Sequence, residues 1–255
     1  MEKSYNIYHN LGYWFLLLIL LVLGGFYSSY FLLFFQPTPS IIHIHFILMT
    51  LWIIMLIVQP FLIKYKKVAI HRKLGQISFI LVPLVLTSSF LMIRLSFYRV
   101  SNDLHQKAAA GLNQLNTEQI LRQASAYEAI AIFWLLILAL FYCLAIINRR
   151  KSAVHARYMV ATALSLLGPT VDRILLFSFK LEKLPGSIPI EAAAFFIADL
   201  VLAFLLWKDY NNNFPTKTLW TCLLIYLIGQ VLYFTLPGTD AWTNLVTFIM
   251  KPAPG

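Results

Sequence analysis

The chain has 255 residues, of which 60% are hydrophobic and only 12% are charged, and its 20 Lys and Arg against 10 Asp and Glu give a formal net charge of +10. This composition excludes an ordinary water-soluble globular domain and is typical of a polytopic membrane protein. The positive charge does not indicate nucleic-acid binding, because the basic residues lie in short connectors between apolar runs, where the preference of cytoplasmic loops for Lys and Arg accounts for them.

Seven apolar runs each approach the ~20 residues that a helix needs to cross the hydrocarbon core of a bilayer. We therefore predict an all-α, polytopic transmembrane bundle of seven helices that forms a single domain over residues 1–255. The expected spans are 12–34, 43–63, 75–95, 128–147, 155–178, 189–207 and 218–236. Cys143 and Cys222 lie inside such runs without CxxC spacing, which indicates neither a disulfide framework nor a thiolate metal site.

The connectors predict the orientation of the bundle. Basic residues gather in alternate connectors, between spans two and three, four and five, and six and seven. Because cytoplasmic loops carry the excess of Lys and Arg, we expect a protein of the inner (cytoplasmic) membrane with its N-terminus in the cytoplasm and its C-terminus outside. The external stretch 96–127 then contains an interfacial helix, which begins near Thr117 and runs into span four. After Leu236 the chain is too short to span again, and Trp242 and Phe248 are expected at the outer interface.

Two histidines, His43 and His45, open the second span. His43 lies about 200° round an ideal helix from His45, so both cannot point at one ligand unless the first turn is unwound. Residues three or four apart after His45 form one stripe, which we expect to face the bundle because it carries groups that lipid would not favour. The later members of this stripe are Met49, Trp52, Leu56 and Gln59.

The ionisable residues of the spans fall into two layers. The inner layer holds His71 and His155, at the heads of spans three and five. Asp199 is the most deeply placed residue of the outer layer, and a carboxylate at that depth costs several kcal/mol unless it is protonated or paired. We expect it to pair with Arg94 or Arg173, or else to relay protons or bind a ligand. The outer layer comprises His43, His45, Arg94, Glu128, Asp172, Arg173, Glu191 and Asp199.

Neutral imidazoles are ligands for haem iron, copper and zinc. The leading hypothesis is an integral membrane protein that binds haem or a transition metal and serves a redox or assembly role, with a small-molecule or electron-transfer partner. The metal pair is His43 and His45, and the wider cofactor-binding set is His43, His45, His71 and His155. A His–carboxylate site that activates water is also open, so the sequence does not decide whether the protein is an enzyme. The alternative is a non-enzymatic transporter, channel or membrane scaffold with a buried His/Asp/Arg network.

Two segments resemble the signatures of a widespread family of uncharacterised bacterial multi-spanning membrane proteins. HIHFILMTLWIIMLIVQPFLIKYKKVAIHRKLG carries a histidine pair and a His-Arg-x-Leu-Gly turn, and HARYMVATALSLLGPTVDR carries a His-x-Arg-x-Met run that leads to Gly-Pro and a terminal arginine. The resemblance carries no information about the activity of the protein. It singles out His43, His45, His71, Arg72, Gly75, His155, Arg157, Met159, Pro169 and Arg173.

The His-x-x-x-Met span, followed by a basic turn and a histidine, is also similar to the second and third helices of the di-haem transmembrane cytochrome b electron carriers. That similarity implies haem ligation by histidines. Those proteins place four histidines on four successive helices, whereas spans four and six of this chain carry none. One haem or one metal is therefore the most that the similarity implies.

Overall fold

The structure is a computed structural model that describes residues 10–181 and 183–251. This part of the chain is almost entirely helical, as predicted. The helices are α2 (Leu11–Phe26), α3 (Ser40–Lys64), α4 (Val68–Ala109), α5 (Thr117–Tyr127), α6 (Ala129–Ile147), α7 (Ser152–Leu164), α8 (Leu167–Arg173), α9 (Glu191–Asn211), α10 (Lys217–Thr235) and α11 (Asp240–Met250). The two chain ends, whose sides of the membrane the sequence predicts, lie outside the described residues.

Short non-α elements join some of these helices. α2 and α8 are extended by π-helical turns, Tyr27–Phe31 and Ile174–Ser178. Before α9, strands β1 (Lys183–Leu184) and β2 (Ile188–Pro189) pair in an antiparallel hairpin. The turn from α3 to α4 is closed by Lys66, whose φ of 58° lies in the left-handed region.

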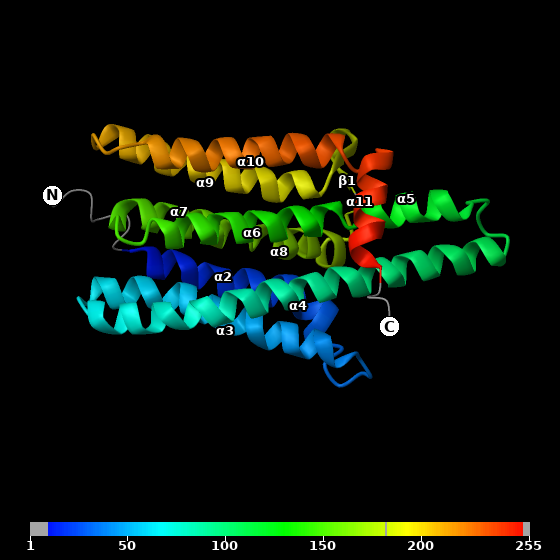
Figure 1. The fold of residues 1–255 in the computed structure, drawn as a ribbon, viewed down its shortest axis with the longest axis horizontal. Coiled ribbons are helices and arrows are strands. Elements are labelled where there is room, and N and C mark those ends of the chain that lie inside the picture. The colour runs from blue at the N-terminus through cyan, green and yellow to red at the C-terminus, as the bar shows by residue number, and fades with distance from the viewer. Residues whose placement is uncertain (1–9, 182, 252–255) are drawn as a thin grey trace.

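The long helices lie side by side along one axis (Figure 1). α9 and α10 form one edge of the bundle, α3 and α4 form the other, and α2, α6, α7 and α8 lie between them. An apolar core runs through this arrangement, and its largest fully buried side chains include Trp52, Phe141 and Tyr226. The rings of Phe141 and Tyr226 stack with their centroids 5.3 Å apart, which joins α6 to α10.

Glycines set the closest helix contacts. A Cβ atom on Gly25 of α2 would lie 2.7 Å from the backbone oxygen of Thr170 in α8, and one on Gly168 of α8 would lie 1.9 Å from Nε1 of Trp134 in α6. Such close approach is typical of helix packing in membranes, where small residues let backbones meet. α8 is therefore fixed between α2 and α6.

Six helices of the described chain are long and apolar enough to cross a membrane. They are Leu11–Phe31, Ser40–Lys64, Val68–Ala109, Ala129–Ile147, Ser152–Ser178 and Lys217–Thr235. The seventh predicted span is the helix α9, which is long enough but carries Glu191, Asp199, Lys208 and Asp209 and is not among the six. The all-α bundle is confirmed and is compatible with an integral membrane protein, whereas the count of seven spanning helices is not confirmed.

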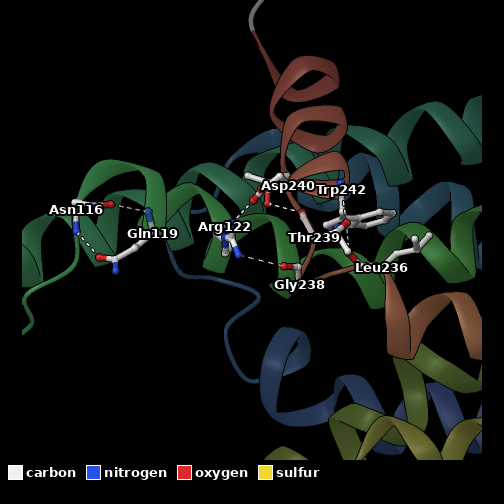
Figure 2. A network of polar contacts seen from close by, with 9 residues as sticks. Asn116, Gln119, Arg122, Leu236, Gly238, Thr239, Asp240 and Trp242 are labelled. Carbon is white, nitrogen blue, oxygen red and sulfur yellow. Dashed lines mark hydrogen bonds and ion pairs between the residues drawn. The ribbon is translucent and has the colours of Figure 1, made fainter.

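The helix that contains the third predicted span, 75–95, extends beyond that span at both ends. α4 has 42 residues, which at 1.5 Å per residue is a length of ~63 Å, about twice the ~30 Å of a bilayer core. Its second half leaves the bundle and forms a hairpin with α5, which we call the α4–α5 hairpin (Figure 1). α5 begins at Thr117 as predicted, but it packs along α4. Its start is capped by Asn116 and Gln119, each of whose side chains accepts the other's backbone N–H at 2.9 Å (Figure 2).

The connectors α3–α4, α6–α7 and α9–α10 all lie at one end of the bundle, which we call the basic end (Figure 1). The opposite end, with the α4–α5 hairpin and α11, is the outer end. Among the described residues the outer half contains eight Lys and Arg against seven Asp and Glu, whereas the basic end has one carboxylate, Asp209, against eleven basic residues. These eleven are Lys64, Lys66, Lys67, Arg72, Lys73, Arg149, Arg150, Lys151, Arg157, Lys208 and Lys217.

Candidate functional site

The stripe that begins at His45 faces the interior of the bundle, as predicted. Trp52 and Leu56 are almost fully buried, at 1% and 2% exposure, whereas Ile47 and Ile54 on the other side of α3 are exposed. His45 reaches across to α4, where its Nδ1 lies 3.1 Å from the hydroxyl of Ser88 in a hydrogen bond.

His43 points elsewhere. Its Nδ1 is hydrogen bonded to the Tyr30 hydroxyl and its Nε2 to the Thr38 hydroxyl, both at 2.9 Å. The first turn of α3 is helical, so the ~200° separation of His43 from His45 persists and the two imidazoles do not converge. The expected metal pair is therefore not assembled, and no group of three or more His, Cys, Asp or Glu is placed to hold a metal ion within residues 10–181 and 183–251.

Four ionisable residues of the predicted outer layer do come together. Asp172 interacts electrostatically with both Glu191 at the start of α9 and its neighbour Arg173, and Arg173 in turn interacts with His45. We call His45, Asp172, Arg173 and Glu191 the outer cluster. Tyr233 of α10 lies within electrostatic range of both carboxylates. Helices α3, α8, α9 and α10 thus each contribute a polar group near the outer end of the bundle.

Within the described residues, the charged side chains of the outer cluster form no ion pair with one another. Arg173 donates through Nη1 to the Pro169 carbonyl at 3.0 Å, and its guanidinium lies 4.7 Å from the centre of the Phe26 ring. The Oδ1 atom of Asp172 is buried and has no hydrogen-bond partner in the described part of the chain. Because Arg173 is held by α8 and α2, it approaches this carboxylate without bonding to it.

The remaining outer residues have other partners. Asp199 accepts hydrogen bonds from Nε2 of Gln230 on both carboxylate oxygens, each at 3.0 Å. Arg94 donates to the backbone carbonyl of Met250 at 3.2 Å. The expected pairing of Asp199 with Arg94 or Arg173 is therefore wrong, because Asp199 faces α10 at the edge of the bundle.

Glu128 lies at the break between α5 and α6 and is only 2% exposed. Its Oε1 atom is buried without a hydrogen-bond partner among the described residues. Burial raises the pKa of the Glu128 carboxyl to about 7, against the opposing effect of a hydrogen bond with Ser96. This carboxyl therefore takes up or releases a proton close to neutral pH.

The two histidines of the inner layer lie near each other at the basic end. They are within electrostatic range, and Nδ1 of His155 donates to the Ala145 carbonyl at 2.8 Å. With its amide oriented to satisfy its neighbours, Gln59 donates to Nδ1 of His71 at 2.5 Å and accepts from the Gly75 N–H at 3.0 Å. The Gln59 side chain thus links the first turn of α4 to the end of α3.

The sequence did not predict a buried ion pair that joins α7 to α9. Asp209 of α9 accepts from Nε of Arg157 in α7 at 2.7 Å, and both side chains are buried. Arg157 also donates through Nη1 to the Ala153 carbonyl at 2.9 Å. The family resemblance singled out Arg157 but gave it no partner, and Asp209 lies 52 residues further along the chain.

In comparisons with known proteins, no family, no curated protein and no solved structure matches this chain.

Proposed function

We propose that the chain is a non-enzymatic, multi-pass protein of the inner membrane that moves protons, alone or together with a solute, through the outer cluster. In this proposal the basic end faces the cytoplasm and the outer end faces outward. The support for the orientation is the charge asymmetry of eleven basic residues against one carboxylate at the basic end, because cytoplasmic loops of membrane proteins carry the excess of Lys and Arg.

The observation that carries the proposal is the buried Oδ1 atom of Asp172, which has no hydrogen-bond partner among the described residues. An unpaired carboxylate at membrane depth costs several kcal/mol. The nearby carboxylate of Glu191 adds repulsion when both groups are ionised. A proton or a cation bound between them removes both costs, and buried carboxylates that exchange protons in this way are the usual elements of proton relays in transporters.

Arg173 and His45 suit the same role. The guanidinium of Arg173 stays charged, so it keeps the net charge of the outer cluster low when Asp172 is ionised. His45 keeps Nε2 without a hydrogen bond in the described structure while Nδ1 is engaged by Ser88. A neutral imidazole of this kind can accept a proton at one nitrogen and donate from the other.

The histidines fit haem less well. A haem held by two histidines needs two facing imidazoles with a free nitrogen each. Both nitrogens of His43 are hydrogen bonded, and Nδ1 of His71 is in contact with the Gln59 amide. His45 and His155 belong to opposite ends of the bundle, so they do not face one haem.

The proposal is tested with purified protein in liposomes that contain a pH-sensitive dye, with proton entry driven by a potassium diffusion potential. We expect the wild type to acidify the interior and Asp172→Asn to abolish this flux. Asp199→Asn is the matched control, because it makes the same chemical change at a carboxylate that is already hydrogen bonded to Gln230. A flux that survives in Asp172→Asn, or one lost equally in Asp199→Asn, would refute the role of the outer cluster.

A further inference from the structure

α11 is attached to the α4–α5 hairpin at its start. The Thr239 hydroxyl caps the helix by accepting the Trp242 N–H at 3.2 Å. Asp240 forms an ion pair with Arg122 of α5, which also donates to the Gly238 carbonyl at 3.3 Å. The indole of Trp242 donates to the backbone carbonyl of Ser125 at 2.9 Å (Figure 2). Trp242, which the sequence places at the outer interface, is therefore used to hold α11 on α5.

The end of α11 is attached to the other arm of the hairpin. The carbonyl of Met250 accepts hydrogen bonds from Nε of Arg94 at 3.2 Å and from the Tyr98 hydroxyl at 2.7 Å, both on α4. Val246 and Met250 are fully buried in a small apolar cluster with Ile93, Phe97 and Ala124. One face of α11 is thus fixed against both α4 and α5.

The two flanks of α11 beside this buried face differ in character. At roughly 100° per residue, Leu245 and Ile249 lie about 100° and 60° from Val246 on one flank, and Thr247 lies about 100° from it on the other. Phe248 and Asn244 lie about 40° apart on the face opposite Val246, Phe248 towards the apolar flank and Asn244 towards the polar one. Leu245, Phe248 and Ile249 are 55%, 72% and 38% exposed. Such a division is characteristic of a helix that lies between an apolar and an aqueous phase.

The position of α11 in the fold indicates that the apolar phase is the membrane and the aqueous phase is the solution outside it. α11 runs crosswise to the long helices at the outer end of the bundle (Figure 1). It begins shortly after Thr235, where the candidate span α10 ends. The last turns of α10 expose Leu232 and Phe234. An apolar flank this close to the end of a candidate span is suited to contact with lipid.

We propose that α11 is an interfacial helix that lies in the outer membrane surface, with Leu245, Phe248 and Ile249 in contact with lipid and Asn244 and Thr247 in contact with water. The occupant of the apolar flank is the lipid surface. Because α11 is bonded to both arms of the hairpin, this contact anchors the hairpin to the bilayer. The inference rests on the membrane placement of the bundle and is independent of proton binding by Asp172.

A fluorescent reporter on each flank tests this inference. The variants Leu245→Cys and Thr247→Cys, which lie about 160° apart on α11, are made in a Cys143→Ala background, since the other cysteine, Cys222, is buried. Each is labelled with the fluorophore NBD and placed in phosphatidylcholine liposomes. We expect NBD at position 245 to be quenched several-fold more by lipids that carry a nitroxide near the headgroup than NBD at position 247. We expect iodide on both sides of the bilayer to quench position 247 more.

Two results would overturn the inference. Equal quenching of both positions by iodide means that the apolar flank faces water. Protection of position 245 from both iodide and nitroxide lipid means that protein, such as a second copy of the chain, covers it. Ile249→Cys provides a second reporter on the same flank and should behave like Leu245→Cys. Loss of proton flux in Asp172→Asn is measured separately, so the two proposals fail independently.

Discussion

Arg157 of α7 and Asp209 of α9 form a buried ion pair at the basic end of the bundle, with Nε and Nη2 of the arginine 2.7 and 2.6 Å from Oδ2 of the aspartate. Their side chains are only 3% and 1% exposed. Two charges this deep stabilise each other, because removal of one takes a close opposite charge away from the other in a medium of low dielectric constant.

Removal of either partner should therefore destabilise the protein strongly. We expect Asp209→Asn and Arg157→Ala each to lower the free energy of unfolding by about 3–5 kcal/mol, the usual cost of breaking a buried pair. The control is Asp103→Asn, which breaks the exposed pair with Lys107 and should cost about 0.3–0.5 kcal/mol. Thermal unfolding in detergent measures both. Equal losses in Asp209→Asn and Asp103→Asn would contradict the structural role of the buried pair.

The orientation is tested by cysteine labelling in intact cells. Lys66 and Lys151 lie in connectors at the basic end, and Leu112 lies between α4 and α5 with 77% of its surface exposed. In the Cys143→Ala background, a membrane-impermeant maleimide should label Leu112→Cys from outside. It should label Lys66→Cys and Lys151→Cys only after permeabilisation. The reverse pattern means an inverted protein, and labelling of Lys66→Cys without Lys151→Cys would contradict their common side.

The buried carboxyl of Glu128 should make stability depend on pH. Burial raises its pKa from 4.5 to about 7 in the folded protein, so between these values the folded state holds a proton that the unfolded state has released. Stability is then greatest at low pH and falls as pH rises towards 7, by on the order of 3 kcal/mol at 1.36 kcal/mol per pKa unit. Glu128→Gln should lose this fall between pH 5 and pH 8. The exposed Glu118→Gln should keep it, and a wild-type melting temperature that does not change over the range would count against the burial of a proton at Glu128.

The sequence predicts the features that follow from periodicity. The apolar runs mark the helices, and the spacing after His45 identifies the buried face of α3, because a helix repeats every 3.6 residues whatever surrounds it. The pairing of charges is not periodic. Asp209 with Arg157, and Asp199 with Gln230, depend on how helices far apart in the sequence are rotated against one another. The full length of α4 could not be predicted in the same way. The residues after Arg94 are mostly polar, and this part of the helix packs against α5 and α11 rather than continuing an apolar run.

A cofactor assay distinguishes the two hypotheses that the sequence left open. We expect the purified protein to lack a Soret band and to contain no stoichiometric iron, copper or zinc, because both nitrogens of His43 are hydrogen bonded and no three His, Cys, Asp or Glu of the described residues are placed to hold a metal ion. Absorption and elemental analysis of the protein in detergent measure this. A Soret band that disappears in His155→Ala would restore the haem hypothesis. His155 is chosen because its Nδ1–H already donates to a backbone carbonyl, the hydrogen bond that usually orients a metal-ligating histidine.

Two adjacent glycines of α2 provide a test of the packing that carries Asp172. A Cβ atom on Gly25 would meet the backbone oxygen and Cα of Thr170 at 2.7 and 3.0 Å, whereas one on Gly24 would meet only the end of Ile174 at 3.6 Å. Backbone atoms cannot rotate away, so Gly25→Ala must push α8 from α2. We expect it to cost about 1–3 kcal/mol, as overpacking does, and to reduce proton flux because Asp172 follows Thr170 by two residues. Gly24→Ala should leave flux unchanged and gain up to about 1 kcal/mol from helix propensity. Thermal unfolding and liposome flux decide the outcome, and two variants of equal stability and flux would show that α2 and α8 do not pack at Gly25.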